Sequence, residues 1–375
     1  MVLFSRTDKS LMGRWWWSVD RPLLVCFIAL MFFGVMLTMA GSPPVAERLE
    51  LDSFHFVKRH VVMLVPTLAL MIFFSFLNLK NIRLISMGLF VAVVCLLIIT
   101  PFIGTEIKGA RRWLNMGGFS LQASEFLKPV FCIMNAWVFS HLAKQFELKR
   151  PWLVSMGLFG CMALLLLLQP DLGMTVVITS IWAIQFFMTG LSFQVIAVIG
   201  ILGISGLVGS YFLFPHVSDR INKFLFITDD KFGASYQIEK SLNAFRNGGL
   251  WGQGPGEGVY KKHLPDAHAD FIFSVAGEEF GLIVCAILAS VFAVIFFRAI
   301  VQLNRERNYF VIIAGVGLVV SFTFQSVINM ASALNLIPTK GMTLPFVSYG
   351  GSSLLALGIH TGLILGLTRH RMEYR

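Results

Sequence analysis

Charged residues are scarce in this sequence. They make up 13% of its 375 residues, while 56% are hydrophobic and the mean hydropathy is +0.76. Soluble domains carry about a quarter charged residues, so this composition excludes a soluble globular enzyme. At about 20 apolar residues per membrane span, the hydrophobic content is enough for about ten transmembrane helices and leaves none for a separate soluble domain.

Cysteine and acidic residues are also few. The five cysteines all lie inside hydrophobic runs, without a C-x-x-C pair or a histidine at ligand spacing, so we expect neither a disulfide nor a zinc site. The 20 acidic residues are outnumbered by 30 lysines and arginines, which gives a net charge of +10. Such an excess often indicates nucleic-acid binding. Here the basic residues stand in short segments between apolar runs, which favours membrane anchoring and no nucleic-acid partner.

The apolar runs predict an all-α, polytopic membrane protein. They lie at about 22–41, 60–79, 84–104, 124–142, 152–169, 172–190, 192–214, 268–297, 309–333 and 350–368. An even number of spans places both termini on one side. Basic residues are roughly twice as dense in the segments on that side, so the positive-inside rule predicts that residues 1–21 and 369–375 are cytoplasmic tails of a single domain, 1–375.

One long loop, residues 215–267 between the seventh and eighth spans, is then extracytoplasmic. A connection of this length is uncommon without a functional reason. Its glycine-rich stretch 248–258 repeats G-x-G, as dinucleotide-binding loops do. No predicted strand precedes it, so we reject that interpretation.

Charges inside apolar spans are costly and indicate functional sites. Glu125 and Lys128 lie three residues apart at the start of the fourth span, on nearly the same helix face. They form either a mutually neutralising pair at a helix start capped by Ser124, or part of a polar cavity that contacts substrate. The residues alone leave both interpretations open.

Asp270 opens the eighth span and is the candidate general base. The residues that follow on its helix face are small, namely Ser274, Gly277 and Gly281. They leave room for a groove or for a close helix neighbour. The alternative role for Asp270 is a simple helix cap. Glu278 and Glu279 lie two turns deeper, and Glu278 is the closer to the face of Asp270.

Two further segments could hold substrate. The cluster 108–113, which contains Arg111 and Arg112, is either an anchor at headgroup level or a phosphate-binding site. Residues 337–353, which contain Lys340, Ser348 and Tyr349, are rich in proline, glycine and hydroxyl groups. This composition predicts irregular backbone at membrane depth, which is tolerated only where it lines a cavity.

Several strings of residues together are similar to the SEDS family (shape, elongation, division, sporulation) of bacterial membrane proteins. They are Arg112-Trp113, the stretch 122–128 (QASEFLK), 169–173 (QPDLG), 264–273 (LPDAHADFIF), Glu278-Glu279, 338–341 (PTKG) and 344–353 (LPFVSYGGSS). The lysine in the PTKG string resembles the division proteins of the family more than its rod-elongation proteins. One departure is Arg246, where family members usually carry glycine, which concerns a local turn.

The resemblance implies a peptidoglycan glycosyltransferase that polymerises lipid II at the division septum of the bacterial inner membrane. It implies Asp270 as the catalytic base, and the substrate-binding candidates are Arg111, Arg112, Glu125, Lys128, Lys340, Ser348 and Tyr349. It further implies a class B penicillin-binding protein, other division membrane proteins and membrane lipid as partners. The lipid tail of the substrate would lie between helices in the bilayer. We expect no cofactor, although a divalent cation such as Mg²⁺ could assist. A lipid II flippase and a non-catalytic division scaffold remain the alternatives.

Overall fold

The computed structural model describes residues 10–107, 110–117, 119–142, 150–190, 234–338 and 341–369, with scattered positions between 198 and 222. Nine of the ten predicted spans correspond to helices. The remaining one, 192–214, lies largely outside the described residues. Residues 215–217, 219–221 and 223–233 of the long loop also lie outside them.

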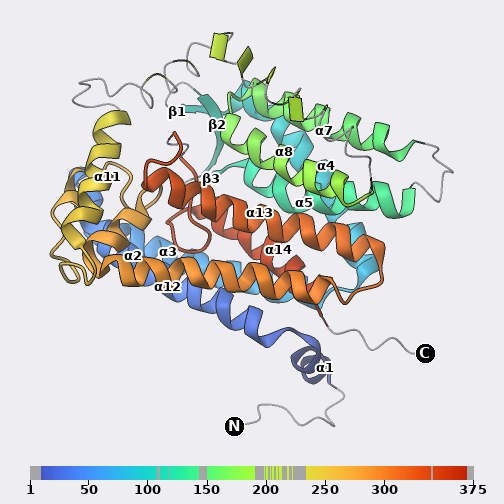
Figure 1. The fold of residues 1–375 in the computed structure, drawn as a ribbon, viewed down its shortest axis with the longest axis horizontal. Helices are drawn as coiled ribbons and strands as arrows, with labels where there is room; N and C mark the ends of the chain where they lie inside the picture. Colours follow the sequence, from blue (N-terminus) through green and yellow to red (C-terminus); the bar gives the residue numbers. More distant parts are fainter. Residues whose placement is uncertain are drawn as a thin grey trace.

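The architecture is an all-α bundle (Figure 1). Its apolar helices are α2 (Arg21–Arg48), α3 (His55–Phe76), α4 (Leu79–Ile103), α5 (Ala123–Trp137) with the π-helical turn η1 (Val138–Leu142), α7 (Pro151–Leu168), α8 (Leu172–Phe187), α12 (Ile272–Leu303), α13 (Tyr309–Ala333) and α14 (Gly351–Leu367). In the continuously described ranges, three shorter helices accompany them, namely α1 (Leu11–Ser18), α11 (Ala234–Gly248) and η2 (Tyr260–His263). Within the described part of the chain, six helices are long and apolar enough to cross a membrane: α2, α3, α4, α7, α12 and α13.

A small antiparallel sheet separates α4 from α5, where we predicted only a connecting segment. Its strands β1 (Thr105–Ile107), β2 (Ala110–Met116) and β3 (Phe119–Leu121) follow the order β1-β2-β3. Along β2, Leu114 is buried whereas Arg111 is exposed, as expected for a strand with one covered face. Three short strands with several charges give a weak sequence signal, which is why the sheet was not expected.

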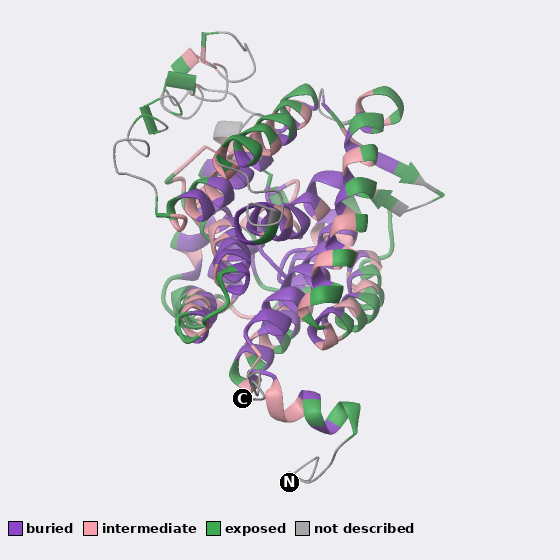
Figure 2. Ribbon diagram, turned by 90° about the vertical axis from the view of Figure 1, so that its right-hand side faces the viewer, coloured by how far each residue is buried: buried purple, intermediate pink, exposed green. Residues whose placement is uncertain are grey.

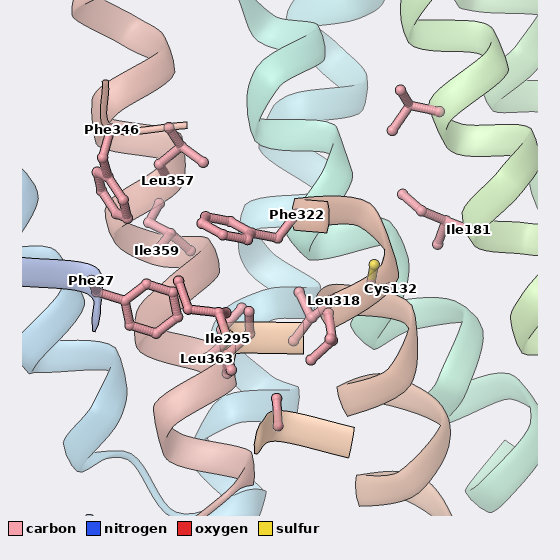
Figure 3. Close-up of a cluster of buried hydrophobic side chains, with 14 of the residues drawn as sticks. Phe27, Cys132, Ile181, Ile295, Leu318, Phe322, Phe346, Leu357, Ile359 and Leu363 are labelled. Atoms are coloured by element: carbon pink, nitrogen blue, oxygen red, sulfur yellow. The ribbon is translucent and has the colours of Figure 1, made fainter. Parts of the chain in front are cut away.

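Helices α5, α13 and α14 contact one another and are mostly buried. Figure 2 shows the buried residues in the interior of the bundle and the exposed residues toward its outside. Phe27 of α2, Phe322 of α13 and Phe346 are fully buried and pack edge-on or tilted, with ring centroids 5.6 to 6.3 Å apart (Figure 3). Phe346 belongs to the irregular segment that precedes α14. This segment is therefore part of the core and not a surface loop.

Helices α3 and α14 approach each other closely through glycine. A Cβ atom at Gly358 would lie 2.5 Å from the carbonyl oxygen of Thr67, and one at Gly362 would lie 2.6 Å from that of Met71. Small residues four apart on one helix face allow such backbone contact inside a membrane, where packing and not the hydrophobic effect holds helices together.

Helix α2 continues past residue 41, where we predicted its end, to Arg48. Pro44 has no N–H to donate to the carbonyl of Ala40. Lys261 Nζ binds that freed carbonyl oxygen at 3.3 Å, so the extension is satisfied by the long loop. In Figure 1, α11 lies at one end of the bundle, and α1 and the end of α14 lie at the other.

Candidate functional site

Asp270 lies in the turn directly before α12 and is half-buried. The side-chain amide of Asn329 on α13 donates to the backbone oxygen of Asp270 at 3.0 Å and to that of Met342 at 2.6 Å. Gly341 has a φ of +60°, and a Cβ atom there would come within 3.2 Å of Asp270 Oδ2. The segment before α14 therefore passes directly beside the carboxylate of Asp270.

Ser348 and Tyr349 hold the same turn in place. Ser348 Oγ donates to the carbonyl oxygen of Ala269 at 2.6 Å and accepts from the backbone N–H of Leu344 at 2.8 Å. The backbone N–H of Tyr349 donates to the carbonyl oxygen of His268 at 2.9 Å. The irregular, mostly buried backbone of 341–350 agrees with its composition.

A ring cluster covers the turn on another side. The imidazole of His268 stacks on Phe56 of α3, with centroids 4.2 Å apart, and Tyr349 lies 5.2 Å from Phe56 and 5.3 Å from His268. Burial lowers the pKa of His268 to about 4, against a smaller opposite effect of the Asp266 carboxylate. This imidazole is therefore neutral at physiological pH.

Glu125 and Lys128 form a buried ion pair on α5, with Lys128 Nζ 2.7 Å from Glu125 Oε2. Lys128 also donates to the amide oxygen of Gln325 on α13. Ser124 does not cap this helix. The helix begins after Gln122 without a side-chain cap, and Ser124 Oγ donates to Asp171 at 3.3 Å instead. The predicted cap was wrong because Ser124 already lies inside the helix.

A series of hydrogen bonds connects this ion pair with the segment beside Asp270. The amide nitrogen of Gln325 donates to the backbone oxygen of Thr343 at 3.0 Å. The hydroxyl groups of Thr343 and Ser353 are 3.0 Å apart, and Ser353 donates to Glu125 Oε2 at 3.2 Å. The site is thus one polar layer between the ends of α5, α12, α13 and α14.

Gln325 and Asn329 did not stand out in the sequence, whereas Thr343 and Ser353 were noted only as part of the segment 337–353. Gln325 and Asn329 lie four residues apart in an otherwise apolar run, so both point to one face of α13. That spacing is the signal from which this pair could have been identified.

The arginines of β2 lie on opposite faces of the strand. Arg112 donates to the carbonyl oxygens of Gln169, at 3.2 Å, and of Pro170, and lies 3.9 Å from Asp171. It therefore holds the connection between α7 and α8. Arg111 is half-exposed and lies 3.5 Å from Glu106. Lys340 lies outside the described residues.

The two deeper carboxylates have structural partners. Glu278 accepts hydrogen bonds from Asn247 Nδ2 and from the backbone N–H groups of residues 259–261, at 2.7 to 3.1 Å. Glu279 is paired with Lys261. Gly277, directly before them, makes room for a close helix neighbour and not for an open groove. The ring of Phe245 on α11 occupies the position where a Cβ atom of Gly277 would lie.

Arg246, where the family resemblance leads us to expect glycine, is an exposed residue within α11. Its helical position requires no glycine conformation, so the departure is accommodated. Across the described ranges, no group of three or more His, Cys, Asp or Glu side chains is arranged to hold a metal ion.

The FtsW/RodA/SpoVE family model, described as "Cell cycle protein", matches residues 20–373. The chain is 42% identical over 369 residues to "Probable peptidoglycan glycosyltransferase FtsW" of Caulobacter vibrioides (strain NA1000 / CB15N), covering 98% of this chain and 94% of that protein. It is 35% identical over 355 residues to the protein of the same name from Escherichia coli O6:H1, covering 92% and 85%.

Two solved structures share the fold. A chain from "Structural coordination of polymerization and crosslinking by a peptidoglycan synthase complex" gives a TM-score of 0.76 at 24% identity, covering 93% of this chain and 97% of that one. The rod shape determining protein RodA of Thermus thermophilus gives 0.68 at 23% identity, covering 94% and 97%. At these identities, the structures support the arrangement of helices and not the roles of individual residues.

Proposed function

The chain belongs to the FtsW/RodA/SpoVE family of cell cycle proteins and is a peptidoglycan glycosyltransferase, and from this premise we propose that it polymerises lipid II with Asp270 as the general base. The observation that carries the proposal is the polar layer around the Asp270 turn. Asn329 and Ser348 fix the backbone of this turn, while Lys128 and Glu125 lie in the same hydrogen-bonded layer.

The chemistry requires few groups from the protein. A lipid diphosphate is already a good leaving group, so the enzyme supplies a base for the attacking sugar hydroxyl and positive charge for the departing phosphates. One direct displacement converts the α-linked donor into a β-1,4 glycan by inversion. Asp270 takes the proton in that step, and no resident cofactor is needed.

The basic residues of the site have two different roles, binding of the substrate phosphates and compensation of buried charge. Lys128 is 2% exposed and already shared by Glu125 and Gln325, so its first role is to neutralise the polar layer. Arg111 is half-exposed and is the described β2 arginine with more freedom to meet a phosphate. Lys340 lies outside the described residues and remains a phosphate-binding candidate by its charge alone.

We also propose a place and a partner. The chain is a multi-pass membrane protein, and its similarity to division proteins supports the septum as its site of action. One solved neighbour is a chain of a peptidoglycan synthase complex that couples polymerisation with crosslinking. This supports a penicillin-binding protein that crosslinks the new strands as the partner of this chain.

The test is Asp270→Asn in the purified full chain, supplied with lipid II and its transpeptidase partner. Removal of one general base lowers the rate by about 10²-fold to 10⁴-fold. Polymer is measured on a gel, and insertion and folding are checked by size-exclusion chromatography. The neighbouring carboxylate Asp266 provides a matched control, since Asp266→Asn leaves the proposed base in place.

Near-normal polymer from Asp270→Asn at equal protein level would remove Asp270 from the mechanism. Translocation of lipid II without polymer from the unmodified protein would favour the flippase. The absence of both polymerisation and translocation, with the partner present, would favour the non-catalytic scaffold.

A further inference from the structure

The glycine-rich segment 249–254 fills a break in α12. Gly281 has a φ of +77° and interrupts the helix. Two amides after the break donate to carbonyls of the segment, and two amides of the segment donate to carbonyls before the break. The bonds are Leu282 N to Gly249 O (3.0 Å), Ile283 N to Leu250 O (3.3 Å), Gln253 N to Glu278 O (2.9 Å) and Gly254 N to Glu279 O (3.0 Å).

This contact is formed between backbones at close range. A Cβ atom at Gly252 would collide with the backbone of Glu279 and Phe280, and one at Gly281 would collide with that of Leu250 and Gly252. Glycine at both positions lets the segment lie directly against the helix. The segment therefore has a fixed height along α12.

The length of α12 gives that height relative to the membrane. The piece of α12 after the break, residues 282–303, has 22 residues and extends over about 33 Å, which matches the apolar core of a bilayer, about 30 Å thick, or about 20 helical residues. Near its far end, Arg298 pairs with Asp20 at 3.1 Å, next to Arg21, whose guanidinium lies over the Trp17 ring. Arginine and tryptophan together are typical of the headgroup level.

Gly281 lies 17 residues before Arg298, about 26 Å along the helix, so α12 reaches the region of the opposite boundary of the apolar core at its break. The segment 249–254 therefore lies at headgroup level, on the side of the long loop. Its two large apolar side chains are uncovered there, with Trp251 81% exposed and Leu250 62% exposed. They adjoin Leu282 and Ile283, which are themselves exposed on the outer surface of α12.

We propose that Leu250 and Trp251 insert into the outer leaflet of the bilayer and anchor the long loop at headgroup level. Their side chains continue the apolar surface that α12 presents to lipid. Tryptophan favours this level, because its ring is amphipathic. Lipid is the occupant that matches both this position and this apolar surface.

The anchor fixes the height of the catalytic turn, and this consequence rests on the proposed function. Between the break and the start of α12 lie nine residues of helix, about 14 Å. Asp270 is thus held above the level where a lipid diphosphate lies, at the height of the sugars attached to it. Glu278 fastens residues 259–261 to the same helical piece, so the loop and the Asp270 turn share one support.

The test uses the full chain without its native cysteines, with one cysteine at position 251 that carries the fluorophore NBD. The protein is reconstituted in phosphatidylcholine vesicles with or without lipids that bear a doxyl quencher. We expect a loss of fluorescence as large as that of a probe at Ile283, and little loss for a probe at Glu257, an exposed residue of the same loop. A probe at Leu250 serves in place of position 251 if that variant fails to fold.

An unquenched probe at 251 or 250, beside a quenched probe at 283, would overturn the proposal. Equal quenching at 257 would also overturn it, because the whole loop and not a two-residue anchor would then lie in lipid. Quenching needs no catalysis, so a failure of the polymerase mechanism leaves this result intact. If the lipid anchor and the polymerase mechanism are both correct, Trp251→Gln lowers polymerisation several-fold in vesicles, whereas Trp251→Phe keeps most of the activity.

Discussion

Lys128 carries a charge that only its partners in the protein can compensate. Its side chain is 2% exposed, and Glu125 and Gln325 bind its ammonium. Removing one partner of a buried ion pair leaves the other charge without compensation, which costs about 3–5 kcal/mol. Replacing both partners by neutral residues of similar size costs much less.

We therefore predict that Lys128→Met strongly lowers the melting temperature of the purified protein and that Glu125→Gln with Lys128→Met recovers most of it. Thermal unfolding in detergent, followed by size-exclusion chromatography, measures both. A Lys128→Met protein as stable as the unmodified one would contradict the structural role. A stable double variant without polymerase activity would assign the pair an additional role in chemistry.

His268 makes the stability of the Asp270 turn dependent on pH. Its pKa is lowered from 6.5 to about 4 by burial, so an unfolded chain takes up a proton between these values that the folded protein does not. Stability is therefore complete above pH 6.5 and falls as the pH decreases toward 4. The full difference corresponds to about 3 kcal/mol.

The measurement is the melting temperature between pH 4 and 7. We predict that His268→Phe, which keeps a ring against Phe56, removes part of the decrease, whereas His263→Gln at an exposed position leaves it unchanged. An identical pH profile for His268→Phe would show that other groups cause the decrease.

At the residue scale, the sequence was enough to identify charged residues inside apolar spans. Asp270, Glu125 and Lys128 were found because charges there are costly. Gln325 was not, because its partner Lys128 lies 197 residues away and a neutral polar residue has many other possible environments. Arg112 was a candidate either for membrane anchoring or for phosphate binding, whereas its neighbours Gln169 and Pro170 became visible only in three dimensions.

Among the helices, the contact between α3 and α14 depends on the absence of side chains. We predict that Gly362→Ala lowers stability by about 1–3 kcal/mol, since the added methyl group meets the backbone of Met71 and has nowhere to move. Gly160→Ala on α7 is the matched control, because a Cβ atom there has no neighbour within 4 Å. Thermal unfolding of the two variants side by side provides the comparison, and equal stability would mean that the helices separate at little cost.

Hydrophobic runs predicted the elements because each run must be a helix to satisfy its backbone inside lipid. They could not predict how helices end or break. Helix α2 passes two prolines, and Lys261 binds the carbonyl of Ala40 that Pro44 leaves free. Helix α12 is interrupted at Gly281, where the segment 249–254 supplies the missing hydrogen bonds. The first outcome depends on a loop residue more than a hundred residues away, and the second on a contact between backbones. Local composition shows neither.

For the whole molecule, the two ends of the bundle differ in chemistry. Helix α11 lies at one end of the bundle and α1 at the other (Figure 1). The Asp270 turn precedes α12, which packs against α11, whereas Arg298 near the other end of α12 pairs with Asp20, between α1 and α2. A polymerase that builds the wall outside the cell needs the first end on the extracytoplasmic side. The density of basic residues in the short connecting segments independently favours the second end as cytoplasmic.

This orientation predicts the accessibility of single cysteines placed in a chain without its native ones. A cysteine at Glu257 or Lys262, both exposed in the long loop, should react with a membrane-impermeant thiol reagent in intact spheroplasts. A cysteine at Arg305, exposed between α12 and α13, should react only after permeabilisation. Labelling is read as a shift on a gel, with the unsubstituted cysteine-free chain as the blank. The reverse pattern would place Asp270 in the cytoplasm, away from the growing glycan strand, and a base at that position could not serve polymerisation outside the membrane.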